Sequence, residues 1–324
     1  MKKLQQTAIL LILIGLVGYT IYDKTRHDPK PIVPEKAYES ETLLIDLPQS
    51  IEFCSEKVPM KELAVREKLD KDLHANTFFH SNTILIIKRA NRWFPQMRPI
   101  LKKNGIPEDF LYLAVIESNL QNLISPAGAV GFWQFMEPTA KEMGLEVNKY
   151  VDERYHPIKA TKAACKYLKK AYRRFGNWTL VAASYNMGMR GLERQMERQK
   201  ADSYYELALN SETARYVYRI LAMKEIMERP HKYNFKIPPR NLYWQPKTRT
   251  VEVTETINDL AAFAEENGIS YGSLKYHNPW LRTDKLKVKK GDSYQIELPL
   301  EGPTNTYAHE KRLDQKAAGT LGSQ

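Results

Sequence analysis

The sequence is poor in cysteine and lacks a metal-binding pattern. Its 324 residues include two cysteines, Cys54 and Cys165, too few for a fold that depends on several disulfide bridges. Cys165 lies on the apolar stripe of a predicted helix, which indicates a small core residue, although a bridge between the two thiols stays open in an oxidising compartment. The histidines are scattered without the short spacings typical of metal ligands. We therefore expect no metal and no cofactor.

Long apolar runs are also missing, apart from one near the N-terminus. Residues 8–21 are apolar, and they follow Lys2 and Lys3. This length lies between the core of a signal peptide and a membrane span, which needs about 17 residues or more. No convincing cleavage site follows, so we interpret residues 1–24 as an uncleaved signal anchor, with a cleaved signal peptide as the alternative. Both predict that the remainder is exported, beginning with a proline-containing linker over residues 25–60.

Residues 107–118 predict a buried helix that ends in a single carboxylate. Pro107 suits the first helical position, and Glu108 and Asp109 suit the first turn. The residues that follow leave almost no polar face, which is typical of a buried helix. Glu117 stands at the C-terminal end, where burial and the negative end of the helix dipole both favour the protonated carboxyl group. It is therefore a general-acid candidate, unless the side chain simply leaves the helix end for solvent.

A small-residue loop and a second polar helix end follow Glu117. Residues 125–136 contain two glycines, which allow close backbone approach, and Phe132 and Trp133, which offer apolar faces for a flat ligand. Gln134 carries a donor and an acceptor on one end, which suits a hydroxyl-rich ligand. Residues 183–188 then end another apolar helix with a polar pair and a glycine. Each segment alone could be packing and capping, but the three in this order indicate a site.

These segments carry a resemblance to a known family. Three motifs resemble the signature motifs of the soluble-lytic-transglycosylase superfamily, which shares its fold with goose-type lysozyme: Glu117-Ser118, Gly131-Phe132-Trp133-Gln134 and Ser184-Tyr185-Asn186. The resemblance covers roughly residues 85–230, and the Phe-Trp variant of the middle motif looks most like the membrane-bound lytic murein transglycosylase D branch. It implies a mainly α fold with a lysozyme-like helical catalytic domain, which we place at residues 61–240.

The resemblance also implies roles for individual residues. Glu117 would be the catalytic acid and base, and further side chains would line the sugar-binding cleft: Ser125, Gln134, Met136, Tyr185, Asn186 and Tyr216. Two positions depart from the family pattern, because Ser184 stands where alanine is commoner and Glu137 adds a carboxylate after Met136. Glu137 leaves open whether a second acid serves the site.

The activity implied by the resemblance is cleavage of peptidoglycan between N-acetylmuramic acid and N-acetylglucosamine. A single acid favours the non-hydrolytic route, in which the sugar's own C6 hydroxyl closes a 1,6-anhydro ring. A lysozyme-type hydrolase and a non-catalytic wall-binding protein are the alternatives. The implied location is the cell envelope, on the periplasmic side of the inner membrane.

The positive charge of the chain agrees with such a polyanionic partner. The formal net charge is +11, with Lys and Arg spread along the sequence. On the predicted helix over residues 157–175 these residues lie opposite the apolar stripe, so a solvated helix face is the simpler interpretation. No nucleic-acid-binding motif accompanies the charge, and we therefore expect peptidoglycan strands and the membrane, but no nucleic acid, as partners.

The character of the sequence changes after Pro239. Two alternating segments, residues 250–254 and 293–298, predict strands, and two short helices are predicted between them. This small α+β (strand-helix-helix-strand) unit at residues 248–300 resembles a divergent LysM module, a carbohydrate-binding fold. We expect it to tether the enzyme to its polymer, and a structural brace for the helical domain is the alternative. Residues 301–324 predict a polar tail.

Overall fold

The structure, a computed structural model, describes residues 44–300. The segments expected as a signal anchor (1–24) and a polar tail (301–324) lie outside the described residues, as does most of the expected linker. From Ile45 onward the described residues belong to one compact unit. In this described part of the chain, no helix is both long and apolar enough to cross a membrane.

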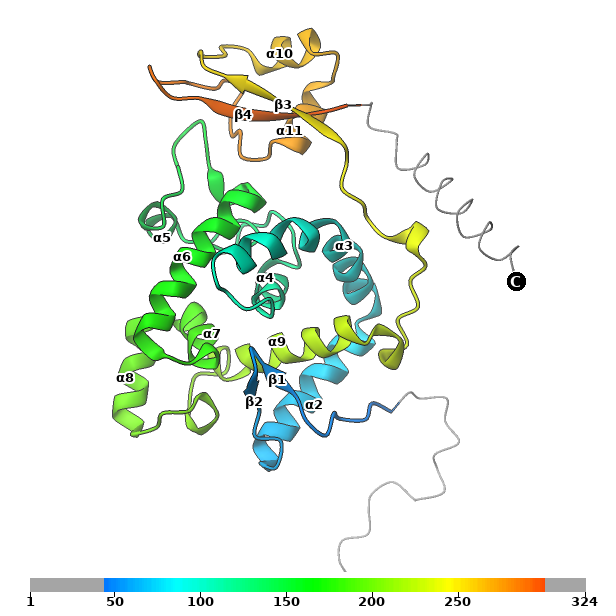
Figure 1. The fold of residues 1–324 in the computed structure, drawn as a ribbon, viewed down its shortest axis with the longest axis vertical. Helices are drawn as coiled ribbons and strands as arrows, with labels where there is room; N and C mark the ends of the chain where they lie inside the picture. The colour runs from blue at the N-terminus through cyan, green and yellow to red at the C-terminus, as the bar shows by residue number, and fades with distance from the viewer. Residues whose placement is uncertain (1–43, 301–324) are drawn as a thin grey trace, which may run out of the picture. The chain divides into compact units, whose positions relative to one another are not determined.

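The first part of this unit is helical, as Figure 1 shows, which confirms the mainly α prediction. Its helices are α2 (Leu63–Phe78), α3 (His80–Lys103), α4 (Phe110–Ser118), α5 (Glu137–Glu142), α6 (Pro157–Phe175), α7 (Trp178–Met187), α8 (Met189–Gln199) and α9 (Thr213–Glu228). Helix α9 packs against α2, α4 and α7, while α6 packs against α3 and α7. One continuous hydrophobic core therefore unites segments far apart in the sequence.

Helix α4 lies inside this core. Every residue of α4 except Glu117 is buried, which agrees with a helix that has no polar face. The helix begins at Phe110, three residues after the expected start, and ends after Ser118 because Asn119 adopts a left-handed conformation with φ 52°. Asparagine tolerates this conformation better than most residues. The chain thus leaves the helix directly after Glu117 and Ser118.

Helix ends in the second half of the domain agree with the capping residues. Gly176 ends α6 with φ 63°, and the side chain of Asn177 accepts a hydrogen bond from the backbone N–H of Leu180 at the start of α7. Helix α8 was not expected from the sequence. Leu192 is fully buried, and Met189 and Met196 pack against the core beside it, so α8 carries a narrow apolar stripe that could have predicted this helix.

Residues 51–60, which we expected to belong to the linker, pack into the helical core. A short hairpin, β1 (Glu52–Phe53) and β2 (Glu56–Lys57), places Phe53 fully out of solvent. The carboxylate of Glu56 accepts hydrogen bonds from the backbone N–H groups of Trp178 (2.5 Å) and Thr179 (2.8 Å). An anion at the N-terminus of α7 is stabilised by the unpaired N–H groups there.

The two cysteines are not bonded to each other. Cys165 is fully buried on α6, as its place on the apolar stripe predicts, and burial raises the pKa of its thiol to about 11. Burial also raises the pKa of Cys54, which lies in the hairpin turn. Both thiols are therefore protonated and unreactive at neutral pH.

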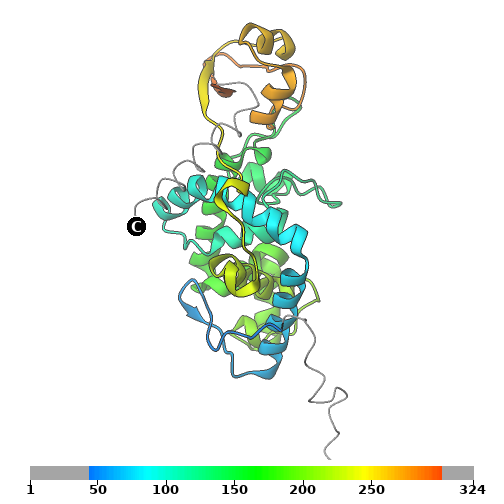
Figure 2. The same cartoon turned by 90° about the vertical axis from the view of Figure 1, so that its right-hand side faces the viewer.

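The C-terminal module has the predicted strand-helix-helix-strand order. Its elements are β3 (Thr248–Val253), α10 (Leu260–Glu266), α11 (Tyr271–His277) and β4 (Tyr294–Pro299). Strands β3 and β4 form an antiparallel pair in which Thr248 lies opposite Pro299 and Val253 opposite Tyr294. Figure 2 shows both helices on this pair. Asp259 caps α10 and Ser270 caps α11 through side-chain hydrogen bonds.

The module packs against the helical domain and shares a core with it. Its hydrophobic cluster includes Val130, Val151 and Tyr155 from the helical domain. Backbone hydrogen bonds join Asp152 N to Trp280 O (2.9 Å) and Arg282 N to Tyr150 O (2.8 Å). Because the core of the module is completed by its neighbour, the structure favours a brace over an independently tethered unit.

The segment that leads into β3 is held along α3. Asn91 Nδ2 donates to the carbonyl oxygen of Tyr243, and Arg92 Nε donates to that of Trp244, both at 2.9 Å. Gln96 adds a hydrogen bond to the side chain of Gln245 at 2.7 Å. These bonds fix the segment that connects the helical domain to the C-terminal module along the surface of α3.

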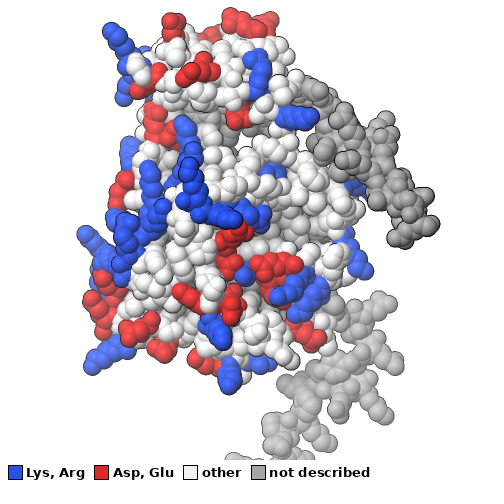
Figure 3. Space-filling model, in the orientation of Figure 1, with Lys and Arg blue, Asp and Glu red and all other residues white. Residues whose placement is uncertain are grey.

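Charged side chains of both signs share the surface in Figure 3. Three of the seven basic residues of α6 pair with acidic neighbours: Lys159 with Glu153, Lys170 with Glu142 and Arg174 with Glu193. This pairing agrees with the interpretation of α6 as a solvated, ion-paired helix face.

Candidate active site

Glu117 and Tyr216 meet at the centre of the helical domain. Glu117 is the second-last residue of α4, and Tyr216 lies one turn into α9. The Tyr216 hydroxyl donates a hydrogen bond to Glu117 Oε1. Tyr216 is 2% exposed, so this oxygen is held from the interior of the protein. The other carboxyl oxygen, Oε2, is left for other partners.

The surroundings of Glu117 raise its pKa from 4.5 to about 7. Burial is the largest cause, because it removes water that would stabilise the ionised form. The hydrogen bond from Tyr216 and the charge of Arg219 lower the pKa, and the charge of Glu212 raises it. The balance is a carboxyl group that is protonated in about half of the molecules near pH 7, which is suitable for a general acid.

The middle motif forms a tightly folded loop beside Glu117. Ser118 Oγ donates to the carbonyl oxygen of Phe132 at 2.9 Å, which joins the end of α4 to this loop. Gly131 has φ 80°, and a Cβ there would lie 2.0 Å from the carbonyl oxygen of Arg154. Any side chain at this position would displace the backbone, so the glycine is required for a close approach.

Arg154, in the short helix η1 (Glu153–Tyr155), holds the same loop from the other side. Its guanidinium pairs with Asp152 at 2.7 Å and donates to the carbonyl oxygens of Gly128 (3.3 Å) and Phe135 (3.2 Å). Side-chain exposure of the Arg154–Asp152 pair is 9% on each side. A fork of five donors is well suited to bind several carbonyls at once.

Phe132 and Trp133 are both buried, and the expected role of Trp133 as a face for a ligand is wrong. Their exposures are 2% and 0%. Trp133 Nε1 donates to Thr161 Oγ1 at 2.9 Å, and Phe132 packs edge-on against Trp93 with ring centroids 5.0 Å apart. Burial of these large apolar rings contributes more to stability than a solvent-facing position would.

Gln134 and Ser125 are both hydrogen-bonded within the loop. Gln134 has φ 47°, and its Nε2 donates to the carbonyl oxygens of Gly131 (2.8 Å) and Leu123 (3.2 Å). The amide oxygen of Gln134 is thereby left to accept from a ligand. Ser125 Oγ accepts from Ala129 N at 3.0 Å and closes the turn.

The third motif lies at the end of α7. Tyr185 donates to the carbonyl oxygen of Trp133 at 2.8 Å, so it supports the residue before Gln134. Burial raises the pKa of Tyr185 well above its usual value, and the negative charge of Glu117 adds to this effect. Asn186 Nδ2 donates to Glu212 Oε1 at 2.9 Å, and its Oδ1 accepts from Thr213 Oγ1 at 2.7 Å. Asn186 therefore joins α7 to the start of α9.

Glu137 and Met136 lie at the outer edge of the loop. Glu137 is in the first turn of α5 and pairs with Lys141 at 2.6 Å. This hydrogen bond lowers the pKa of Glu137, and Glu137 is not among the groups that shift the pKa of Glu117. Met136 is 43% exposed and precedes α5.

Three charged residues near the site were not predicted: Arg154, Glu212 and Arg219. Arg219 Nη2 donates to the carbonyl oxygen of Ile116 at 2.9 Å, next to Glu117. Its position three residues after Tyr216 on α9 could have indicated a shared helix face. Among residues 44–300, no cluster of three or more His, Cys, Asp or Glu side chains is placed to hold a metal.

Comparisons with known proteins agree with this architecture. The Transglycosylase SLT domain model matches residues 97–208, and the soluble lytic transglycosylase C-terminal LysM-like domain model matches residues 249–302. The first match contains all three motifs but not Tyr216, and the second contains the module from Arg249 onward. The chain therefore carries an SLT transglycosylase domain with a C-terminal LysM-like domain.

The chain is distantly similar to a particular protein of this class, membrane-bound lytic murein transglycosylase D. The similarity to that protein of Escherichia coli strain K12 is 26% identity over 228 residues, which is 68% of this chain and 49% of the relative. The protein of the same name in Escherichia coli O6:H1 gives the same figures. The chain spans about half the length of these curated relatives.

Proposed function

We propose that this protein is a lytic transglycosylase that cleaves peptidoglycan between N-acetylmuramic acid and N-acetylglucosamine and leaves a 1,6-anhydro end. The observation that carries this proposal is the carboxyl group of Glu117, with a pKa of about 7, held by a single hydroxyl group. The SLT domain match and the relatives support the same class of reaction.

In the first step, protonated Glu117 donates its proton to the glycosidic oxygen as that bond breaks. Tyr216 holds Oε1, so Oε2 is the oxygen that faces the leaving group. Positive charge develops on the muramyl ring, and the new carboxylate stabilises it. The Tyr216 hydroxyl and the charge of Arg219 both favour the ionised state that Glu117 now adopts.

In the second step, the same carboxylate accepts the proton of the muramyl C6 hydroxyl. The C6 oxygen then bonds to C1, the anhydro ring closes and Glu117 is protonated again. No water is consumed, and the atoms balance with one acid alone. The two other carboxylates next to the motifs are engaged elsewhere: Glu137 with Lys141 and Glu212 with Asn186.

The remaining site residues are proposed to position the glycan. Gln134 offers its amide oxygen, while Tyr185 holds the backbone before it. Ser125, Met136 and Asn186 would border the same substrate strand. We further propose that the protein acts in the cell envelope and that residues 1–24 direct export or anchor the chain. The mass of the mature N-terminus in membrane and soluble fractions tests the latter.

Analysis of the sugar ends tests the reaction. Purified peptidoglycan is digested with the full chain, and the soluble products are separated and weighed by mass spectrometry. Anhydro ends are lighter than reducing ends by one water, and we expect anhydro ends alone. Reducing ends alone would make the protein a lysozyme-type hydrolase. If wild type and Glu117→Gln release soluble glycan products equally, Glu117 is not the catalytic acid. If neither protein releases products, a non-catalytic wall-binding protein is favoured.

A further inference from the structure

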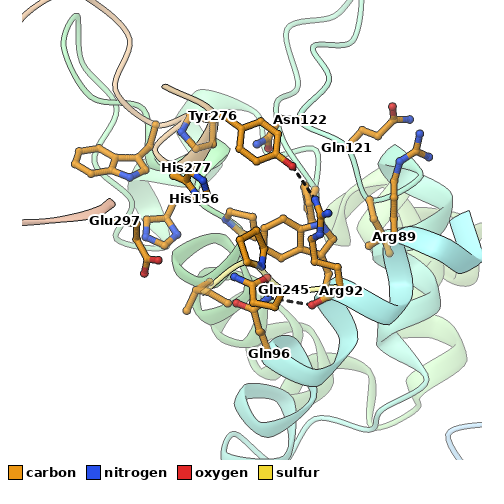
Figure 4. A pocket seen from close by; sticks show the side chains of 18 of the residues that line it. Arg89, Arg92, Gln96, Gln121, Asn122, His156, Gln245, Tyr276, His277 and Glu297 are labelled. Atoms are coloured by element: carbon orange, nitrogen blue, oxygen red, sulfur yellow. Dashed lines mark hydrogen bonds between the residues drawn. The ribbon is translucent and has the colours of Figure 1, made fainter. Parts of the chain in front are cut away.

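A pocket of about 410 Å³ lies between the helical domain and the C-terminal module, as Figure 4 shows. Helix α3 supplies Arg89 and Arg92, and the module supplies Tyr276, His277 and Glu297. Glu117 does not line it. The volume is within the range of about 300–1,000 Å³ typical of small-ligand sites.

The pocket is formed partly by the segment that carries the catalytic candidate. Leu120, Gln121 and Asn122 follow Glu117 within five residues and line the pocket, as does Phe132 of the middle motif. The backbone that presents Glu117 thus also forms a wall of the pocket. A ligand here lies against the segment that follows Glu117 rather than at a remote surface.

One end of the pocket carries two guanidinium groups without a carboxylate partner. Within residues 44–300, neither Arg89 nor Arg92 forms an ion pair. Arg89 Nη1 donates to the carbonyl oxygen of Asn119 at 3.3 Å, and Arg92 Nη1 donates to the hydroxyl of Tyr276 at 2.8 Å. Each guanidinium has further N–H donors, and a carboxylate is the ligand that such forks bind best.

The module side of the pocket carries the carboxylate of Glu297 and the ammonium group of Lys275, which already donates to the carbonyl oxygens of Leu281 and Thr283. Figure 4 shows Glu297 and His277 on the module side, away from Arg89. Glu297 accepts a hydrogen bond from Thr248 Oγ1 at 2.5 Å and has no ion pair within the described part of the chain. A ligand with a carboxylate at one end and an ammonium group at the other matches this distribution.

The walls between these ends combine aromatic rings with unsatisfied polar atoms. Trp93, Tyr243 and Trp280 line the pocket. Asn122 Oδ1 and His156 Nδ1 are buried in its wall without a hydrogen-bond partner among the described residues. Burial lowers the pKa of His156 to about 4, so its ring is neutral at pH 7. Such atoms cost free energy unless water or a ligand satisfies them, and peptide N–H and C=O groups are suitable partners.

We propose that this pocket binds a short peptide that bears a carboxylate at the Arg89 and Arg92 end and an amino group at the Glu297 end. The peptide side chains of peptidoglycan have this chemistry, so the source of the peptide rests on the proposed function. A neutral sugar would leave both charged ends unused. The pocket would then select glycan strands that still carry their peptides and align them beside Glu117.

Calorimetric titration of the full chain tests this proposal. The ligands are the free tetrapeptide released from the wall, the same peptide with its carboxylates amidated, and a chitin tetrasaccharide. The variants are Arg89→Gln and Tyr276→Ala, since Tyr276 is 62% exposed and its truncation leaves the core intact. Arg98→Gln is the matched control, because Arg98 is on the same helix and pairs with Glu108 outside the pocket.

We expect wild type and Arg98→Gln to bind the tetrapeptide equally. Arg89→Gln should weaken binding about tenfold or more, and amidation of the peptide should have a similar effect, because a charge-assisted hydrogen bond is lost. Tyr276→Ala should weaken binding to a smaller extent, and the tetrasaccharide should not compete. If a thermal melt shows that Arg89→Gln does not fold, the affinity of wild type for the amidated peptide and the affinity of Tyr276→Ala for the tetrapeptide test the proposal instead.

Absence of tetrapeptide binding to wild type, equal binding of the amidated peptide, or displacement by the tetrasaccharide would overturn the proposal. The tetrapeptide contains no glycosidic bond, so this result is independent of cleavage. If the protein binds the peptide but forms no anhydro ends, only the proposed reaction is refuted. If it forms anhydro ends but does not bind the peptide, only the proposed peptide site is refuted.

Discussion

Two carboxyl groups in the interior of the helical domain have opposite surroundings. Glu117 contacts one hydroxyl group, that of Tyr216, and has no ion pair among residues 44–300. Glu225, on α9, is 2% exposed but pairs with Arg229 and Lys232 and accepts from the Tyr233 hydroxyl at 3.0 Å. Burial alone therefore does not make a general acid. The pKa of Glu117 is raised because burial outweighs the opposing hydrogen bond from Tyr216 and the charge of Arg219.

The largest expected effect is on activity. Glu117→Gln removes the proton donor and should reduce kcat on soluble glycan fragments about 10²–10⁴-fold, as is usual for loss of a general acid. Glu225→Gln should leave the kcat of the folded protein nearly unchanged, because Glu225 is bound to structural cations. Anhydro-product formation per folded molecule measures both. Similar kcat losses in the two variants would erase the distinction between these carboxyl groups.

The next effect is on the pH dependence of stability. The pKa of Glu117 is about 7 in the folded protein and 4.5 as its ordinary value. Below pH 4.5 the group is protonated in both states. Between pH 4.5 and 7 only the unfolded chain releases the proton, so stability falls, by roughly 3 kcal/mol once pH exceeds 7. Glu117→Gln removes this loss.

Denaturant unfolding of wild type and Glu117→Gln at pH 4.5 and pH 8 measures the loss. The variant should gain stability relative to wild type between the two pH values. A difference between the proteins that stays constant with pH would mean that Glu117 ionises as easily in the folded state as in the unfolded chain.

Removal of the other carboxylate should have the opposite consequence for stability. Glu225→Gln leaves the cations of Arg229 and Lys232 without their partner. We expect a loss of about 2–3 kcal/mol at pH 7, less than for a fully buried pair because these cations are 58% and 39% exposed. Urea unfolding measures it, with Glu193→Gln as an exposed-pair control that should change little. No loss in Glu225→Gln would mean that the network contributes nothing.

The smallest effect is expected when the hydroxyl group of Tyr216, which donates a hydrogen bond to Glu117, is removed. Tyr216→Phe removes a hydrogen bond that lowers the pKa of Glu117, so the pKa should rise. Because the acid must be protonated, activity falls as pH increases through this pKa, and the falling limb should move to higher pH. The cost at the optimum should be about 1 kcal/mol, a typical value for one hydrogen bond. A limb that stays in place would show that Tyr216 has a structural role only.

The local parts of this picture could be predicted from the sequence. An apolar run with a terminal carboxylate predicts α4 and the place of Glu117, and the alternating and helical segments after Pro239 predict the module. Gly176 and Asn177 predict helix ends. These features depend on neighbours within a few residues, so periodicity and capping are sufficient. Helix α8 was missed although Met189, Leu192 and Met196 form a narrow apolar stripe, because most of its other positions are polar or charged.

Long-range contacts could not be predicted in this way. Whether Trp133 faces a ligand or the core depends on Thr161, which accepts its hydrogen bond, and the module docks through residues near Asp152 and Trp280. The contrast between Glu117 and Glu225 likewise depends on which cations the fold brings near each one. Sequence by itself determined which residues could be acids and where helices with clear caps, such as α6 and α7, end and begin. Tertiary structure decided which acid is desolvated without an ion pair, because desolvation and Coulomb interactions depend on distances between segments that the chain brings together only when it folds.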